Sequence, residues 1–122
     1  YADEQGAAFR EKYRAKYPGT MGMVYTGGGY DAVQMLAKAL TEVGDPSNFD
    51  AVGDAIRKME YRGINGFYKI DPDTNSGISY PNMTDDPEGG QAHLFFQVQD
   101  NEHRIIAPSP FAEVEFMAPP WW

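Results

Sequence analysis

Three consecutive glycines, followed at once by an amphipathic segment, constrain the fold of this chain more than any other feature. The apolar run over 21–25 favours a short strand, and the glycines occupy 27–29. Apolar residues then recur at helical spacing on one face, namely Tyr30, Val33, Leu36, Ala37, Leu40 and Val43. Gly44 follows, at the position where a left-handed helix end favours glycine. The pattern predicts a strand, a glycine turn and a helix over 30–43.

The glycine junction is also a candidate binding site for an anion. Helix N-termini carry unpaired N–H groups and the positive end of the helix dipole, and glycines leave that backbone open to a ligand. We therefore expect a small ligand at Tyr25, Thr26, Gly27, Gly28 and Gly29, with Tyr25 stacking on its apolar or aromatic portion. The alternative is that the glycines only permit a sharp turn and close packing. No Gly-Lys-Ser/Thr sequence follows them, which argues against a nucleotide.

Composition narrows the possible functions. The chain has 122 residues, of which 42% are hydrophobic, and this is enough for a core. Its net charge of −8 would be repelled by a phosphate backbone, so nucleic acid is not expected as a partner. The sequence contains no cysteine, which excludes disulfides and thiolate chemistry. No apolar run approaches the ~20 residues that span a bilayer. Because the sequence starts with Tyr1 rather than Met, we expect it to begin inside a longer gene product.

Two more segments have the helical period. One covers 2–17, where the aromatic residues at every fourth position are Phe9, Tyr13 and Tyr17. The other begins at Ser47, which together with Asp50 resembles a capping box. The apolar stripe of this second segment consists of Phe49, Val52, Ile56 and Met59. The first half of the chain is therefore expected to be mainly helical.

The second half favours strands and irregular structure. Glycines over 62–66 predict a tight turn before a short strand over 67–70. The segment 71–91 has almost no periodicity, and long excursions of this kind are usually functional or mobile. Alternation over 92–107, interrupted by Asp-Asn-Glu, predicts a β-hairpin. The tail over 108–122 is rich in proline and aromatic residues and is expected to lie extended on a surface.

No metal centre or catalytic group is predicted. Asp71, Asp73 and Asn75 carry side-chain oxygens in an order that resembles a calcium loop, but the glycine comes one residue late and Asn82 stands where such a loop has glutamate. An Asx turn is the expected structure there. His93 and His103 fall out of register on the two arms of the hairpin, so they are not expected to share a metal. We therefore predict neither a cofactor nor an enzyme.

The order of these segments resembles that of a known family. A helix that ends in Tyr-Arg-Ala-Lys-Tyr-Pro-Gly is followed by Tyr-Asp-Ala-Val-Gln-Met-Leu-Ala-Lys-Ala-Leu. An Asp-Pro-initiated helix then leads to Tyr-Arg-Gly-Ile-Asn-Gly-Phe-Tyr-Lys-Ile-Asp. The last segments are a hairpin with Gln-Val-Gln-Asp-Asn-Glu-His-Arg and a Pro-Pro-Trp end. This order resembles the C-terminal third of the type I periplasmic substrate-binding proteins of ABC importers, and most closely the branched-chain amino acid and aromatic-acid receptors.

The resemblance implies an α/β fold with two three-layer α/β/α lobes and a ligand cleft between them, of which this chain is an incomplete C-terminal fragment. It assigns 1–70 to part of the first lobe, 92–107 to a β-hairpin of the second lobe and 108–122 to an extended C-terminal strap. The irregular excursion over 71–91 replaces a shorter turn of the family. Three consecutive glycines are also unusual for the family at 27–29.

The resemblance also implies a function. The chain would be the portion of a solute receptor that binds a small carboxylate-bearing ligand, either a branched-chain amino acid or an aromatic acid. The family's ligand contact falls near Tyr25, Thr26 and Gly27. The implied partners are the remainder of the same polypeptide and an ABC permease, and the implied location is the periplasm or, with a lipid anchor, another extracytoplasmic surface. The alternative is a ligand-sensing regulator or a sensor ectodomain on the same fold.

Overall fold

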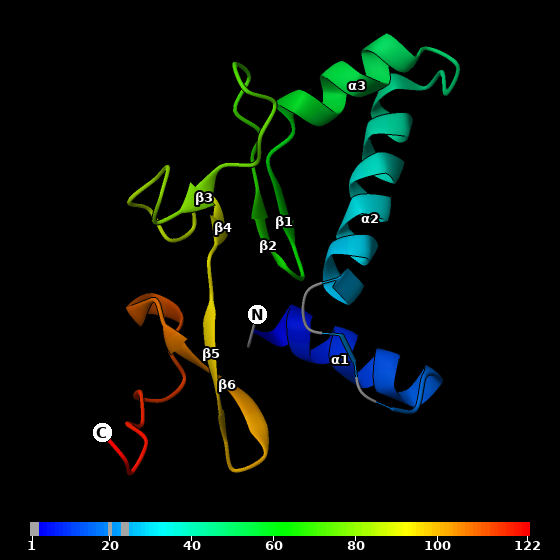
Figure 1. Cartoon of the computed structure of the whole chain (residues 1–122). Coiled ribbons are helices and arrows are strands. Elements are labelled where there is room, and N and C mark those ends of the chain that lie inside the picture. The colour runs from blue at the N-terminus through cyan, green and yellow to red at the C-terminus, as the bar shows by residue number, and fades with distance from the viewer. Residues whose placement is uncertain (1–2, 20, 23–24) are drawn as a thin grey trace.

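The computed structural model describes residues 3–19, 21–22 and 25–122, with helices in its first half and paired strands in its second (Figure 1). The helices are α1 (Glu4–Lys16), α2 (Tyr25–Val43) and α3 (Phe49–Lys58). The strand pairs are β1 (Tyr61–Gly63) with β2 (Gly66–Tyr68), β3 (Ser79–Tyr80) with β4 (Gln91–Ala92), and β5 (Phe95–Gln99) with β6 (Glu102–Ala107). A short 3-10 helix, η1 (Ser109–Phe111), follows β6.

The strands form separate two-stranded sheets within the described part of the chain. The β1–β2 and β5–β6 pairs are antiparallel, whereas β3 and β4 are parallel. Helices α2 and α3 lie beside the β1–β2 hairpin, and the β5–β6 hairpin extends away from them (Figure 1). None of the helices among the described residues has the length and hydrophobicity that crossing a membrane requires.

Helix α1 confirms the predicted aromatic spacing. Asp3 caps its start, because the Asp3 carboxylate accepts the N–H of Gly6 at 2.8 Å. The ring centroids of Phe9 and Tyr13 lie 6.0 Å apart, and those of Tyr13 and Tyr17 lie 5.1 Å apart. Phe9 also packs against Tyr30 of α2 with a centroid distance of 5.0 Å. The aromatic stripe therefore joins α1 to the first half of α2.

Helix α2 begins at Tyr25 rather than Tyr30, so the predicted glycine turn is wrong. The glycines at 27–29 lie inside the helix although each costs about 1 kcal/mol relative to alanine in a helix interior. The strand predicted over 21–25 is not found in the described part of that segment, because Met21 and Gly22 are irregular and Tyr25 is helical. Residues 23 and 24 of that prediction lie outside the described residues.

The buried face of α2 also differs from the predicted one. Its buried residues are Gly27, Asp31, Met35 and Ala39, at intervals of one helical turn. Three residues of the predicted face are instead well exposed, with relative exposures of 44% for Tyr30, 64% for Val33 and 45% for Leu36. The β1–β2 hairpin approaches the Asp31 face closely because Gly27 on α2 and Gly63 on the hairpin have no side chains.

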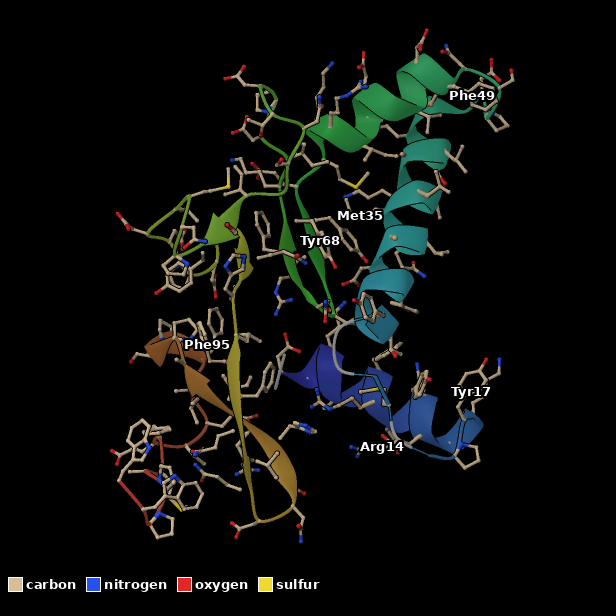
Figure 2. The ribbon with its side chains drawn as sticks, viewed as in Figure 1. Arg14, Tyr17, Met35, Phe49, Tyr68 and Phe95 are labelled. Carbon is tan, nitrogen blue, oxygen red and sulfur yellow. The ribbon has the colours of Figure 1, made fainter. Side chains whose placement is uncertain are left out.

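The hydrophobic core lies where α2, α3 and the β1–β2 hairpin meet. Its buried members are Met35, Ala39, Val52 and Met59, and the half-buried side chains around them are Leu40, Val43, Ala55, Ile56, Tyr61 and Tyr68. Figure 2 shows the side chains of Met35 and Tyr68 between α2 and the hairpin. The core is small, since it depends on two helices and one hairpin.

The start of α3 is capped by Asn48, not by Ser47 as predicted. The Asn48 side chain accepts the N–H of Ala51 at 3.2 Å. The Ser47 hydroxyl instead donates to Asp45 at 2.7 Å, and this bond is the first cause that lowers the pKa of Asp45. Phe49, predicted as part of the apolar stripe, is 79% exposed because it is the first residue of the helix.

The segment 71–91 combines an Asx turn with the parallel β3–β4 pair. The Asp71 carboxylate accepts the N–H groups of Asp73 at 2.8 Å and Thr74 at 3.3 Å, which confirms the predicted Asx turn. Further along, Asp86 accepts the N–H of Glu88 at 2.9 Å through its side chain. The excursion therefore consists of local turns stabilised by short polar side chains.

The predicted hairpin over 92–107 is confirmed as β5–β6. Its turn is formed by Asp100 and Asn101, with φ values of 54° and 62°. The tail then returns along β5, where the Gln97 amide donates to the Met117 carbonyl at 2.7 Å and accepts the Met117 N–H at 2.9 Å. At the end of the tail, Trp121 and Trp122 are 80% and 84% exposed.

Candidate ligand-binding site

A fully buried carboxylate, Asp31, organises the region around the first turns of α2. It has no exposed surface, and its oxygens accept the N–H of Ile64 at 2.9 Å and the N–H of Asn65 at 2.8 Å. The hydroxyl of Tyr68 donates a third bond, at 3.0 Å. Backbone and phenol donors of this kind satisfy the oxygens of a buried carboxyl group. Asp31 therefore ties α2 to the β1–β2 turn.

Two glycines permit this close approach. A Cβ atom on Gly63 would lie 2.4 Å from the carboxyl carbon of Asp31, and a Cβ atom on Gly27 would lie 2.8 Å from the side-chain oxygen of Asn65. A side chain at either position would therefore force Asn65 or Asp31 to shift. Gly27 therefore packs closely on Asn65. The ligand contact expected at Gly27 stays a prediction. A Cβ atom on Gly29 would have nothing within 4 Å of it, so packing does not require glycine there.

The structure places the predicted ligand residues together on the first turns of α2. Tyr25 is 89% exposed, while Thr26 and Gly28 are half-buried and Gly27 is buried. The N–H groups of the first turn have no carbonyl partner four residues earlier in the helix. By the same helix geometry, the N–H of Gly29 pairs with the carbonyl of Tyr25. The first-turn N–H groups that the helix itself leaves without a partner therefore belong to Tyr25, Thr26 and Gly27.

No acidic side chain competes for these donors within the first turn of α2. The other two helices differ, because α1 begins after the capping residue Asp3 and α3 after the capping residue Asn48. Val24, which precedes α2 in the sequence, has no side-chain oxygen that could accept a hydrogen bond. An anionic ligand would thus find N–H groups without an acidic neighbour in their own turn, at the positive end of a long helix.

Two tyrosines beneath the turn have raised pKa values. Burial, and then the negative charge of Asp31, raise the pKa of the Tyr68 phenol to about 12. The same two causes raise the pKa of Tyr61. Both phenols therefore remain protonated at neutral pH, and Tyr68 keeps donating to Asp31. The sequence did not predict the hydrogen bond from Tyr68 to Asp31, because in the sequence Asp31 looks like an ordinary polar residue on a helix.

The histidines do not form a second site. His103 pairs with Val98 in the β5–β6 hairpin, whereas His93 precedes β5 and lies 3.3 Å from the Asn82 amide. Among the described residues, no group of three or more histidine, cysteine or acidic side chains could hold a metal ion. The chemistry that the site offers is hydrogen bonding to an anion from backbone donors, beside one exposed aromatic ring.

Comparison with known proteins adds two findings. A family model described as periplasmic binding protein matches residues 1–90. A solved structure from Silicibacter pomeroyi, provisionally identified as a branched-chain amino acid ABC transporter, is 32% identical with a TM-score of 0.88 over 99% of this chain. The match covers 32% of that structure, so this chain spans about a third of its length. No curated protein sequence matches this chain.

Proposed function

Because the chain belongs to the periplasmic binding protein family, we propose that it is part of a solute receptor of an ABC-type importer. The receptor binds a small carboxylate-bearing solute, either a branched-chain amino acid or an aromatic acid, in a cleft between two lobes. It acts in the periplasm, or at an extracytoplasmic surface through a lipid anchor, and delivers the solute to a membrane permease. In this proposal the receptor binds its solute reversibly and does not catalyse a reaction.

The observation that carries this proposal is the composition of the first turn of α2. Tyr25, Thr26 and Gly27 present backbone donors at the start of a 19-residue helix whose first turn holds no acidic residue. Such a turn is suited to a carboxylate, because backbone N–H groups and the helix dipole both favour negative charge there. The missing side chain of Gly28 leaves room for the ligand to approach the backbone.

Tyr25 supplies the second part of the site. Its ring is 89% exposed and stands on the same turn as the backbone donors. An exposed aromatic ring next to an anion site can cover the apolar part of an amphipathic acid, and this burial adds to affinity. Residues of the remaining polypeptide complete the cleft from the other side, since pockets of this kind bury most of their ligand.

Calorimetric titration with matched ligands tests the proposal. We expect leucine and phenylalanine to bind, and their amides to bind at least tenfold more weakly, because an amide has no negative charge for the helix N-terminus. Equal affinity for an acid and its amide would show that the first turn of α2 does not bind the carboxylate. Failure of every carboxylate in a broad panel to bind would reject the receptor function itself.

A further inference from the structure

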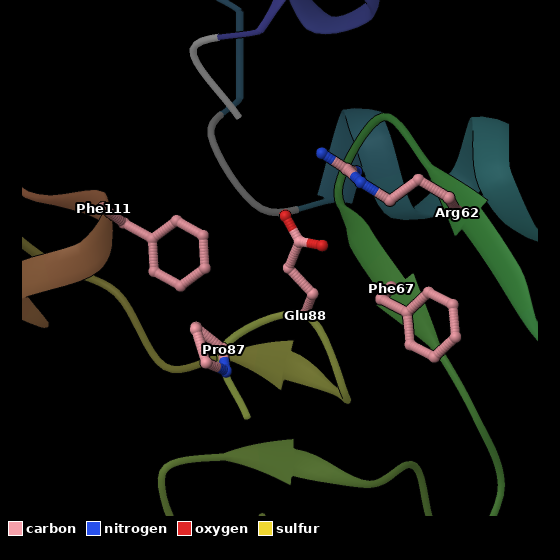
Figure 3. A pocket seen from close by; sticks show the side chains of 5 residues that line it. All are labelled: Arg62, Phe67, Pro87, Glu88 and Phe111. Carbon is pink, nitrogen blue, oxygen red and sulfur yellow. The ribbon is translucent and has the colours of Figure 1, made fainter. Parts of the chain in front are cut away.

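A second pocket lies on the opposite face of the β1–β2 hairpin from α2. Tyr61 and Tyr68 are cross-strand partners that pack against the core, and their neighbours Arg62 and Phe67 are the next partners along the ladder. Because side chains alternate along a strand, this second pair faces away from the core. The space that it faces has a volume of about 300 Å³. Its lining consists of Arg62, Phe67, Pro87, Glu88 and Phe111 (Figure 3).

The loop that carries Glu88 is held in place by its own hydrogen bonds. The N–H of Glu88 donates to the Asp86 side chain at 2.9 Å, and the N–H of Gly89 donates to the Asp86 carbonyl at 3.0 Å. Gly90 is buried so closely against Ile78 that a Cβ atom on it would lie 2.6 Å from the Ile78 carbonyl oxygen. The loop therefore presents Glu88 from a defined backbone position.

The aromatic walls are also fixed. Phe67 lies within β2, opposite Arg62 in the ladder. Phe111 lies in η1, where its ring meets the edge of Tyr80 at a centroid distance of 6.2 Å and an interplanar angle of 77°. In Figure 3 the Glu88 carboxylate points into the space between the Phe111 ring and the β1–β2 hairpin. An acid group thus stands between two aromatic walls that are far apart in the sequence.

The pocket lining carries one positive charge, on Arg62, and one negative charge, on Glu88, and the nearby Asp3 makes the three groups together negative. Arg62 forms an ion pair with Asp3 and donates to the Gly63 carbonyl, so its charge is compensated by a carboxylate outside the lining. Glu88 forms no ion pair within the described part of the chain. A carboxylate beside aromatic rings attracts ammonium groups, because both the charge and the ring faces favour a cation. The net charge of −8 of the whole chain acts in the same direction.

We propose that this pocket binds a small organic cation, namely a protonated amine that carries a short apolar body. Glu88 accepts the hydrogen bonds of the ammonium group, and Phe67, Phe111 and Pro87 enclose the apolar body. The volume matches the lower end of the range for small-molecule pockets, so the ligand has the size of an amino acid rather than a peptide. The pocket is separate from the carboxylate site on α2, and neither depends on the other.

Two probes that carry the same isopentyl group test this proposal in the purified protein. The probes are 3-methylbutylamine and 4-methylpentanoate, titrated by calorimetry and by NMR of ring-labelled phenylalanine. The amine is expected to bind saturably and to shift two phenylalanine signals, which are assigned by Phe67→Leu and Phe111→Leu. Glu88→Gln should weaken amine binding about tenfold, since it removes one charge-assisted hydrogen bond. Glu102→Gln, at an exposed position on β6, is the matched control and should leave it unchanged.

Three results would overturn the inference. The first is an amine that fails to bind, and the second is Glu88→Gln retaining the wild-type affinity for the amine. The third is a carboxylate probe that shifts the Phe67 and Phe111 signals as strongly as the amine does, which would make the pocket an apolar crevice without charge selectivity. Loss of carboxylate binding at α2 has no bearing on these outcomes, so failure of the receptor proposal and failure of this one are distinguishable.

Discussion

Gly63 lies so close to Asp31 that a Cβ atom on the glycine would come within 2.4 Å of the carboxyl carbon. This contact brings the β1–β2 turn onto α2 and lets the buried carboxylate accept the N–H groups of Ile64 and Asn65. A single polar group thus determines how the longest helix of the described residues meets the neighbouring hairpin. The stability of the candidate site depends on this contact.

Replacement of Asp31 by alanine should reduce the free energy of unfolding by about 3 kcal/mol. The buried N–H of Ile64 and the partly buried Asn65 N–H and Tyr68 hydroxyl would lose Asp31 as their acceptor, and a buried loss of this kind costs about 1–3 kcal/mol. Urea denaturation followed by circular dichroism measures the change. Asp85→Asn, an exposed acidic residue in the 71–91 loop, is the control and should change stability by less than about 0.5 kcal/mol. Similar values for the two variants would contradict the structural role of Asp31.

Alanine at two neighbouring glycines of α2 should have opposite effects. Gly27→Ala is expected to destabilise the protein by about 1–2 kcal/mol, because its methyl group would collide with Asn65. Gly29→Ala is expected to stabilise it by about 0.5–1 kcal/mol, since the added methyl group meets open space and alanine favours the helix. The same denaturation assay compares them. A stabilising Gly27→Ala would show that the helix and the turn are not in close contact.

Stability should fall in alkali because of Tyr68. Its pKa is about 12 in the folded protein, raised from about 10, so the unfolded chain loses the phenol proton first. The stabilisation by the protonated phenol is therefore complete below pH 10 and is lost as the pH rises through about 12. Tyr68→Phe should be less stable at pH 8 and should show a shallower decline between pH 10 and pH 12. Parallel pH profiles for the two proteins would contradict this assignment.

Tyr25→Ala should weaken carboxylate binding about fivefold without unfolding the protein. The ring is 89% exposed, so its removal costs the fold little, whereas loss of an aromatic contact with the ligand costs about 1 kcal/mol of affinity. Calorimetry gives the affinity and thermal unfolding gives the stability. Phe49→Ala is the matched control, because Phe49 is 79% exposed and is the first residue of α3, away from the first turn of α2 (Figure 2). Unchanged affinity in Tyr25→Ala would show that Tyr25 does not contact the ligand.

Local patterns in the sequence predicted the elements that depend on local interactions. The Asx turn at Asp71, the β5–β6 hairpin and the aromatic ladder of α1 each result from contacts between residues close in the sequence. The resemblance to the periplasmic binding proteins and the predicted fold class are also confirmed. The division of 1–70, 92–107 and 108–122 between lobes and strap stays a prediction, as does the ligand contact at Tyr25–Gly29.

Features that depend on distant contacts could not be predicted in this way. The early start of α2 requires Gly27 to pack on Asn65, and glycine's low helix propensity alone favours a turn. The inward face of α2 requires Asp31, whose burial is possible only because the β1–β2 turn supplies donors. The sequence contains one relevant indication, since an acidic residue stands one helical turn after Gly27 and a Gly-Ile-Asn-Gly turn follows α3.

The position of the two tryptophans affects how this protein is studied. Trp121 and Trp122 are the chain's only tryptophans, and both lie at the end of the tail with more than three quarters of their surface in solvent. The ring of Trp122 lies 6.0 Å from that of Phe116, and neither tryptophan belongs to the core around Met35. Intrinsic tryptophan fluorescence therefore reports on the surroundings of the tail and not on the core, and its emission is red-shifted even in the native protein. A fluorescence transition that precedes the loss of helical ellipticity would mark release of the tail, while the helices remain folded.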